Sequence, residues 1–432
     1  MKKSLNELIQ SLALQDVEVL RSIYTFRCLN ENQIDQLHFK NSMPIDQQQS
    51  KAFTSRCIQE LLDWELVRVV EYLGAERVYF LTPLGIEVIR HYFKMPRNIY
   101  DAKKKVVKRG YYRASELAIY PKNINHQVRL NQFVIDFQIQ NSELNWKYFD
   151  EKYVSQYTNI RPDGMLSILD TDFFLEMDMA TESKKQLYEK WENYRNFLSS
   201  REYAYREKRI VVLFIVDGTT KIKERIDLIK YTIYERLLDV LDTDFEVYVG
   251  TSDSLLTLMK NKLIPACKNS DPCTAQVKKY LQEQHDFHVS DGDSLNAVLK
   301  GTKYALYIRK LNENNKLLVE GGRIQEFVVD DYFYEPTTIV SKVAYLDKYN
   351  SFFKSIYKRD ISYLIVGESE EKIYNDLKLV DLIGLKNIYF TTLQRLKEKT
   401  FHQAVFQFDL LGNIHHFTNS GLEERVFESN LE

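Results

Sequence analysis

The start of the chain combines helix-like and strand-like patterns of apolar residues. Three segments place apolar residues at helical spacing, and the third, residues 50–64, turns Phe53 toward the core. Two further segments, LVRVVEYL and ERVYFLT, alternate apolar and polar residues around Gly74-Ala75 and predict a β-hairpin. The stretch LTPLGIEVIRHYF then begins another helix. Helix, short helix, helix, hairpin and helix is the order of a winged helix, which we predict over residues 1–96.

Residues 115–265 predict an α/β domain with a mixed sheet. A helix over residues 115–140 is followed by a strand near Trp146 and by the strand-like runs GMLSIL and DFFLEMD. A long amphipathic helix comes next, and residues 209–216 then form the all-apolar run typical of a strand in the centre of a sheet. Helices and one more strand alternate after it. This order predicts an α/β sandwich with a mixed sheet.

Two polar stretches separate the predicted domains. Residues 97–114 form a basic linker, and residues 266–300 form a mostly polar connection. Residues 301–432 predict a further α/β lobe whose order of elements resembles that of the preceding domain, which suggests a degenerate repeat. Asp330 and Asp331 follow one predicted strand there, but no strand pair carries matching acids, so we expect no second active centre.

The composition is that of a folded protein outside the membrane. Hydrophobic residues make up 44% and charged residues 28% of the chain. The longest apolar run has the length of a strand, and the N-terminus lacks the apolar region of a secretory signal. Four cysteines are too few for a disulfide framework, so we expect a cytoplasmic protein. The net charge of −2 means that any attraction to DNA must come from local basic patches.

Two segments carry candidate contacts to double-stranded DNA. The outward face of the third predicted helix presents side chains that can contact phosphates and base edges. These are Lys51, Ser55, Arg56 and Gln59. The basic linker carries a second set that can follow a phosphate backbone. It consists of Lys103, Lys104, Lys105, Lys108 and Arg109. The alternatives are a winged helix that makes only protein contacts and a solvated linker.

The stretch RPDGMLSILDTDFFLEMDMAT, residues 161–181, concentrates the candidate chemistry. A tight turn at residues 170–171 would place Asp163 opposite Asp178 and put Glu176 on the same face of a hairpin. Like charges placed opposite one another destabilise a sheet. We therefore expect a cation to neutralise these acids, and a divalent metal is the obvious candidate.

Other candidate groups give weaker signals. His126 begins the helix ahead of the acidic hairpin, where it is either a hydrogen-bonding group or a catalytic one. The adjacent Tyr111 and Tyr112 are a weak indication of a tyrosine nucleophile. The chain has no GxxxxGK[ST] loop, so we expect no nucleotide cofactor. An approximate zinc-like spacing links Cys267, Cys273, His285 and His288, and a surface helical linker is its simpler interpretation.

The runs NHQVRLNQF, RPDG and FFLEMDMAT occur in this order and resemble the replication-relaxation proteins of plasmids and integrative elements in Gram-positive bacteria. The resemblance covers roughly the first 250 residues. Those proteins pair a winged helix with a domain similar to the PD-(D/E)xK nucleases. The resemblance implies DNA binding at a mobile-element origin, in replication initiation or plasmid relaxation.

The nuclease pattern can be carried over residue by residue. Asp163 matches the first metal-binding acid and Glu176 the acid of the second strand, so the resemblance implies Mg²⁺ or Mn²⁺ at these residues. The pattern then has a lysine where this chain has Asp178. Asp178 could bind a second metal ion, or Lys184 or Lys185 on the following helix could supply the missing positive charge. The third alternative is that the fold is kept and catalysis is lost.

Two functions follow from these alternatives. The first is a metal-dependent DNA-nicking or relaxing protein, in which the winged helix selects the site and Asp163, Glu176 and Asp178 hold the metal. The second is a non-catalytic transcription regulator or initiator scaffold that binds DNA through its winged helix. Its α/β lobes would then serve in homodimerisation and in contacts with partner proteins.

Overall fold

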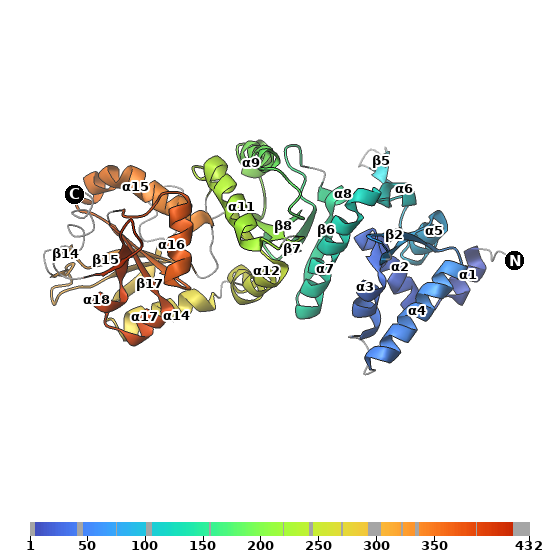
Figure 1. Cartoon of the computed structure of the whole chain (residues 1–432), viewed down its shortest axis with the longest axis horizontal. Coiled ribbons are helices and arrows are strands. Elements are labelled where there is room, and N and C mark those ends of the chain that lie inside the picture. Colours follow the sequence, from blue (N-terminus) through green and yellow to red (C-terminus); the bar gives the residue numbers. More distant parts are fainter. Residues whose placement is uncertain are drawn as a thin grey trace. The chain divides into compact units, whose positions relative to one another are not determined.

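The computed structural model has the mixed α/β architecture that the sequence predicts (Figure 1). The chain divides into two units, Met1–Val154 and Ser155–Glu432. No helix in the described part of the chain is both long and apolar enough to cross a membrane. The described residues are 5–40, 46–74, 76–100, 106–154, 157–218, 220–241, 245–268, 271–292, 304–320, 323–332, 337–385 and 387–417.

The first unit begins with helices around a small sheet. Asn30 caps α3 by accepting a hydrogen bond from the Gln33 N–H, and the Gln33 side chain accepts from the Asn30 N–H in return, as a capping box requires. The strands pair in the order β1-β3-β2. The elements are α1 Leu5–Ser11, α2 Leu14–Phe26, β1 Leu29–Asn30, α3 Glu31–Asp35, the π-helix η1 Gln36–Lys40, α4 Gln47–Asp63, β2 Val67–Tyr72, β3 Glu76–Leu81 and α5 Pro83–Tyr92.

The predicted inward position of Phe53 on α4 was wrong. Its side chain is 42% exposed, whereas the neighbouring Thr54 is fully buried. The Thr54 hydroxyl donates to Asp35 at 3.0 Å and to the backbone carbonyl of Ser50 at 2.9 Å. A short polar side chain can therefore occupy the position next to α3, because a partner satisfies its hydroxyl.

The described part of the basic linker contains a small hairpin. Asn98–Tyr100 (β4) pairs with Val106–Arg109 (β5) in antiparallel fashion. The hairpin ends against Pro96, because a side chain at Gly110 would meet the Pro96 carbonyl oxygen at 2.3 Å. The predicted phosphate contacts Lys103, Lys104 and Lys105 lie outside the described residues.

The helix that the sequence assigned to the α/β domain packs within the first unit instead. Asn131 of α7 is buried, and its amide donates to the carbonyl oxygens of Phe26 at 3.1 Å and Cys28 at 2.6 Å. A buried amide with two backbone partners ties α7 to the end of α2. The remaining elements of this unit are α6 Ala114–Leu117, the 3₁₀ turn η2 Pro121–Asn123, α7 Ile124–Gln140, β6 Trp146–Asp150 and α8 Glu151–Val154.

The second unit begins with an α/β lobe whose strands run in the order β10-β9-β8-β7. The hairpin strands β7 and β8 are antiparallel, and β8, β9 and β10 are parallel. The strand β9 is apolar and buried along nearly its whole length, as expected for a central strand. The elements are β7 Gly164–Ile168, β8 Thr171–Asp178, α9 Lys184–Leu198, α10 Arg201–Ala204, β9 Arg209–Val216, α11 Ile222–Leu237, β10 Phe245–Gly250, α12 Ser252–Leu258, the π-helix η3 Met259–Leu263 and α13 Ile264–Cys267.

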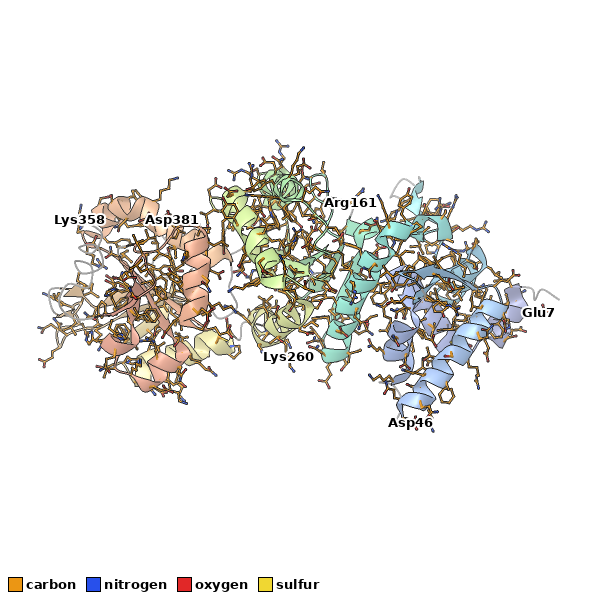
Figure 2. All side chains as sticks on the ribbon, in the orientation of Figure 1. Glu7, Asp46, Arg161, Lys260, Lys358 and Asp381 are labelled. Carbon is orange, nitrogen blue, oxygen red and sulfur yellow. The ribbon has the colours of Figure 1, made fainter. Side chains whose placement is uncertain are left out.

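A second lobe of the same unit is built on a sheet with the order β11-β12-β15-β16-β17-β18-β19. Helices α15 and α16 cover one face of this sheet, and α14 and α17 cover the other (Figure 1). Side chains fill the space between these layers (Figure 2). The elements are α14 Pro272–Glu283, β11 His288–Asp291, β12 Leu306–Arg309, β13 Val319–Glu320, β14 Arg323–Ile324, β15 Glu326–Tyr332, α15 Thr337–Tyr357, β16 Ser362–Gly367, α16 Glu370–Leu379, β17 Ile388–Thr392, α17 Leu393–Glu398, α18 Phe401–Ala404, β18 Phe406–Phe408 and β19 Ile414–His416.

The predicted polar linker of residues 266–300 was wrong for its described part. Helix α14 and strand β11 belong to the second lobe, and β11 pairs with β12. Val277, Leu281, Phe287 and Val289 are buried in its core. In α14 the apolar residues form a single inward stripe. The polar residues between them gave the segment the composition of a linker.

The two lobes of the second unit share one topology, which the sequence suggested as a degenerate repeat. In each lobe an antiparallel strand pair leads through a helix to a parallel strand, and a second helix leads to another parallel strand. The equivalent strands are β7, β8, β9 and β10 in the first lobe and β12, β15, β16 and β17 in the second.

Candidate functional site

The acidic hairpin has the predicted faces but not the predicted register. Gly164 pairs with Leu175, and Ile168 pairs with Thr171, so the turn residues are Leu169 and Asp170 rather than the predicted residues 170–171. Leu169 adopts the left-handed φ of 49° that the turn requires, while Thr171 joins the ladder. The pairing is shifted by two residues. A shift of two leaves each side chain on its predicted face, since side chains alternate with period two.

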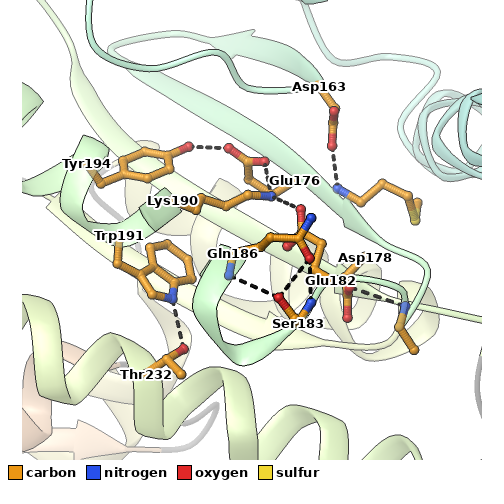
Figure 3. A network of polar contacts seen from close by, with 12 residues as sticks. Asp163, Glu176, Asp178, Glu182, Ser183, Gln186, Lys190, Trp191, Tyr194 and Thr232 are labelled. Atoms are coloured by element: carbon orange, nitrogen blue, oxygen red, sulfur yellow. Dashed lines mark hydrogen bonds and ion pairs between the residues drawn. The ribbon is translucent and has the colours of Figure 1, made fainter. Parts of the chain in front are cut away.

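Glu176 is the centre of the site, and its carboxylate is neutralised from within the chain (Figure 3). Its side chain is 3% exposed. Lys190 Nζ lies 3.0 Å from one carboxylate oxygen, and the Tyr194 hydroxyl donates to the other at 2.6 Å. Lys190 and Tyr194 stand four residues apart on α9, so both project from one face of that helix.

The charges of this cluster perturb one another. Burial raises the pKa of Glu176 to about 7; the nearby Lys190 ammonium opposes this rise, and the charge of Asp163 adds to it. Burial alone would lower the pKa of Lys190, but the carboxylates of Glu176, Asp163 and Glu182 together raise it above its ordinary value. Glu182 contributes an ion pair to Lys190 at 3.0 Å. Lys190 is therefore a permanent cation among three carboxylates.

Asp163 directly precedes β7, at the open end of the hairpin. Its N–H donates to the Leu175 carbonyl at 2.9 Å, and its carboxylate accepts the Met177 N–H at 2.8 Å (Figure 3). The Asp163 side chain thus takes the place of a backbone carbonyl beyond the last ladder pair. This contact fixes Asp163 beside β8, within electrostatic range of Glu176.

Asp178, at the end of β8, belongs to a separate ion pair. It is buried, and Arg225 of α11 donates to both of its carboxylate oxygens, at 2.6 and 2.8 Å. The Ala180 N–H donates to it as well, at 3.2 Å. Such a two-point contact matches the planar guanidinium to the carboxylate and fixes the end of β8 to α11.

With these contacts in place, the carboxylates of Glu176 and Asp178 do not form a site for a divalent metal ion. Within the described ranges, no three His, Cys, Asp or Glu side chains are arranged to hold one. Both oxygens of Glu176 accept hydrogen bonds from α9, and both oxygens of Asp178 accept from Arg225. A metal ion at Glu176 would have to displace the ammonium of Lys190. The cation that the hairpin requires is supplied by two side chains of the protein.

Of the other candidates for catalysis, two are exposed lysines of α9 and the third belongs to the first unit. Lys184 is exposed, and its ammonium lies over the rings of Tyr188 and Tyr231, 5.2 and 4.5 Å from their centroids. Lys185 is exposed and pairs with Glu189 on its own helix. His126 lies on α7 of the first unit, whereas the acids lie in the second.

The sequence reasoning missed Lys190. Its signal was present in the apolar stripe of α9, which includes Leu187 and Tyr194. Lys190 stands three residues after the first and four before the second, so helical spacing places it at the edge of the inward face. An inward lysine after an acidic strand is the pattern that would have identified the pair.

The predicted DNA contacts of α4 are all exposed, but three of them have partners. The hydroxyl of Ser55 donates to Glu31, Arg56 lies 3.4 Å from Glu60, and Gln59 donates to Asp63 at 2.8 Å. The fourth residue of this set is Lys51. In the basic hairpin Lys108 is exposed, and Arg109 forms an ion pair with Glu116 at 2.8 Å.

Two of the residues with zinc-like spacing, His285 and Cys267, take part in ordinary packing. His285 is buried, and its ring contacts the Leu396 carbonyl at 2.7 Å. Cys267 lies against the Thr171 hydroxyl at 3.4 Å. Because no metal-holding group of three such side chains occurs among the residues with described positions, nothing supports a zinc site here.

The second lobe repeats the neutralised acid of the first. Asp330 of β15 is buried two residues before the end of its strand, as Glu176 is on β8. Lys342, on the helix that follows, lies 2.8 Å from Asp330, and the Tyr363 hydroxyl donates to it at 2.7 Å. Both lobes therefore bury an acid on the equivalent strand and neutralise it with a lysine from the next helix.

Comparison with known proteins supports the family that the sequence motifs indicated. Residues 20–213 match the family model described as replication-relaxation. The replication-relaxation match includes α4, the acidic hairpin and Lys190, and it ends within β9, before Arg225 and the second lobe. No curated protein and no solved structure matches the chain.

Removing Arg225 should destabilise the second unit. An Arg225→Ala substitution leaves the buried Asp178 without its guanidinium, so we expect a loss of about 3–5 kcal/mol in unfolding free energy. Lys185→Ala, which removes an exposed lysine from a pair on one helix, should change it by less than about 0.5 kcal/mol. Urea unfolding of both variants measures the difference. Equal stabilities would contradict a buried pair at Asp178.

Glu176 should titrate near neutrality. Its folded pKa of about 7 lies above the ordinary 4.5, so the contribution of its proton to stability is present below about pH 4.5 and is lost as the pH rises through 7. Carbon-13 NMR of labelled glutamate should show a midpoint near 7 that is missing in Glu176→Gln. Lys190→Met removes the adjacent cation and should raise the midpoint, whereas Lys184→Met should not. A midpoint below 5 would contradict this environment.

Proposed function

We propose that this protein acts in the replication or relaxation of a plasmid or integrative element by binding double-stranded DNA, and that its acidic cluster serves the fold rather than strand cleavage. The match of residues 20–213 to the replication-relaxation family model supports a role in replication or relaxation. DNA binding and the loss of catalysis are the parts that we add.

The first unit supports the DNA-binding part. Helices α2, α3, α4 and α5 with the β2–β3 hairpin have the order of a winged helix, whose third helix commonly enters the major groove. Helix α4 presents Lys51 and Arg56 to solvent, and the Arg56 side chain is 73% exposed. Both side chains can reach phosphates or base edges. A homodimer, which would present two such helices, is a further prediction.

One observation carries the non-catalytic part, namely that Glu176 is buried with both oxygens bonded to α9. A nuclease carboxylate must exchange such partners for a metal ion and a phosphate. The same acid and lysine arrangement recurs at Asp330 and Lys342, in a lobe outside the matched family region. A recurrent pairing of this kind is expected if it stabilises a buried acid in this topology.

Metal-dependent DNA nicking is the second candidate, and the position of Lys190 favours it. The nuclease pattern requires a lysine beside the two acids, and Lys190 Nζ lies 3.0 Å from Glu176 and within electrostatic range of Asp163. Lys190 of α9 can therefore supply the positive charge that an aspartate at position 178 cannot. Mg²⁺ or Mn²⁺ would be the cofactor of that activity.

Two assays separate the candidates. Fluorescence anisotropy with duplex DNA from the element's own origin should show binding that weakens about fivefold to tenfold in Lys51→Ala or Arg56→Ala, in line with the loss of one base or phosphate contact. Lys397→Ala, an exposed lysine of the second lobe, should change it by less than twofold. Supercoiled plasmid with Mg²⁺ or Mn²⁺ should not be nicked.

Either part of the proposal can fail separately. Unchanged duplex affinity in both α4 variants would contradict the DNA-binding surface. Nicking that disappears in Lys190→Met and in Glu176→Gln, with the melting temperature of one of them preserved, would contradict a purely structural cluster and establish the second candidate.

A further inference from the structure

A pocket in the first unit lies beside the basic hairpin and is lined by aromatic and cationic side chains. Its volume is about 400 Å³, within the range of sites that hold a small organic group. Aromatic and apolar walls come from Tyr24, Tyr111, Tyr112 and Ile99, and Lys108 and Arg109 bring positive charge to its rim.

Local contacts fix this pocket. The Tyr112 N–H donates to the Tyr24 hydroxyl at 2.8 Å, which joins the chain after β5 to α2. Gly110 lies too close to Pro96 to carry a side chain, so the hairpin and the tyrosines that follow it keep one spacing. The walls are therefore formed before any ligand enters.

The lining residues Lys108, Arg109 and Glu116 give the pocket a small excess of positive charge. The guanidinium groups of Arg90 and Arg109 lie 5.2 and 5.7 Å from the centroid of the Tyr111 ring. The carboxylate that lines the pocket, Glu116, is engaged by Arg109 and by the backbone N–H of Arg113 at 2.6 Å. The exposed Lys108 completes a group of cations around an aromatic wall.

We infer that this pocket binds one unpaired nucleotide of single-stranded DNA, with the base against the tyrosine rings and the phosphate against Lys108. Stacking platforms next to basic side chains are the common means of holding single strands. A duplex presents only base edges in its grooves, whereas an unpaired base presents the flat face that fits an aromatic wall. The inference rests on the proposed function, because it assigns a second DNA contact to the same unit.

The test compares one sequence as a labelled 12-nucleotide single strand and as a duplex. Tyr111→Leu and Lys108→Ala should each weaken single-strand binding by roughly tenfold, as loss of one stacking or phosphate contact does. The duplex affinity of Tyr111→Leu should change by less than twofold. Tyr111→Phe keeps the ring and should bind like the unmodified protein. Tyr120→Leu, an exposed tyrosine of the same unit outside the pocket, should also bind normally.

A 2-aminopurine base in the single strand reports stacking directly. Its fluorescence should fall when the unmodified protein or Tyr111→Phe binds, and the fall should be absent in Tyr111→Leu. Losses that are equal for single strand and duplex, or no loss at all, would overturn the inference. Competition by thymidine monophosphate at micromolar concentration would also overturn it, because the pocket would then serve a free nucleotide rather than a strand.

The outcome of the single-strand test is independent of the outcome for the α4 variants. Arg56→Ala tests duplex binding and should leave the 2-aminopurine signal unchanged. If Arg56→Ala and Lys51→Ala both have no effect on the duplex while Tyr111→Leu abolishes the signal, the duplex proposal fails and the pocket is retained. The opposite pair of results rejects the pocket alone.

Discussion

The ion pair between Glu176 and Lys190 constrains the lobe that contains it. An acid in the middle of a sheet can stay buried only if a cation and a hydrogen-bond donor accompany it. Lys190 and Tyr194 supply these from α9, so α9 must lie across β8 at one position along its length. The position of α9 in turn sets the place of Trp191, whose indole N–H donates to Thr232 of α11 at 2.9 Å. One polar contact therefore fixes two helices on the sheet.

The contacts of Asp178 and Glu176 also limit the chemistry of the acidic hairpin. The residue at the position of a nuclease lysine, Asp178, is held by Arg225, and the lysine of the site comes from a helix instead. A positive charge is present, but it neutralises Glu176 in the ground state. In the second lobe, which lies outside the region matched by the family model, Lys342 neutralises Asp330 in the same way. The acids, the lysine and the tyrosine are thus explained by the physics of burying charge in this topology.

The sequence predicted the alternation of elements and the faces of the hairpin, because both depend only on local periodicity. It did not predict the register, which depends on the left-handed conformation of Leu169. The partner of Glu176 was also missed, because the direction of α9 depends on the chain between β8 and Ser183, whose side chain caps the helix. The linker over α14 was misread since its two buried residues, Val277 and Leu281, form a stripe too narrow to stand out.

We infer that the protein's own side chains, and not a metal ion, neutralise the acidic hairpin. The most direct test is anomalous diffraction from crystals of the full chain soaked in millimolar Mn²⁺ near pH 8, where Glu176 is mostly ionised. We expect no anomalous peak between Asp163 and Glu176, and we expect the Lys190 ammonium to remain beside Glu176. A peak coordinated by both carboxylates at about 2.0–2.2 Å, with Lys190 displaced, would contradict it.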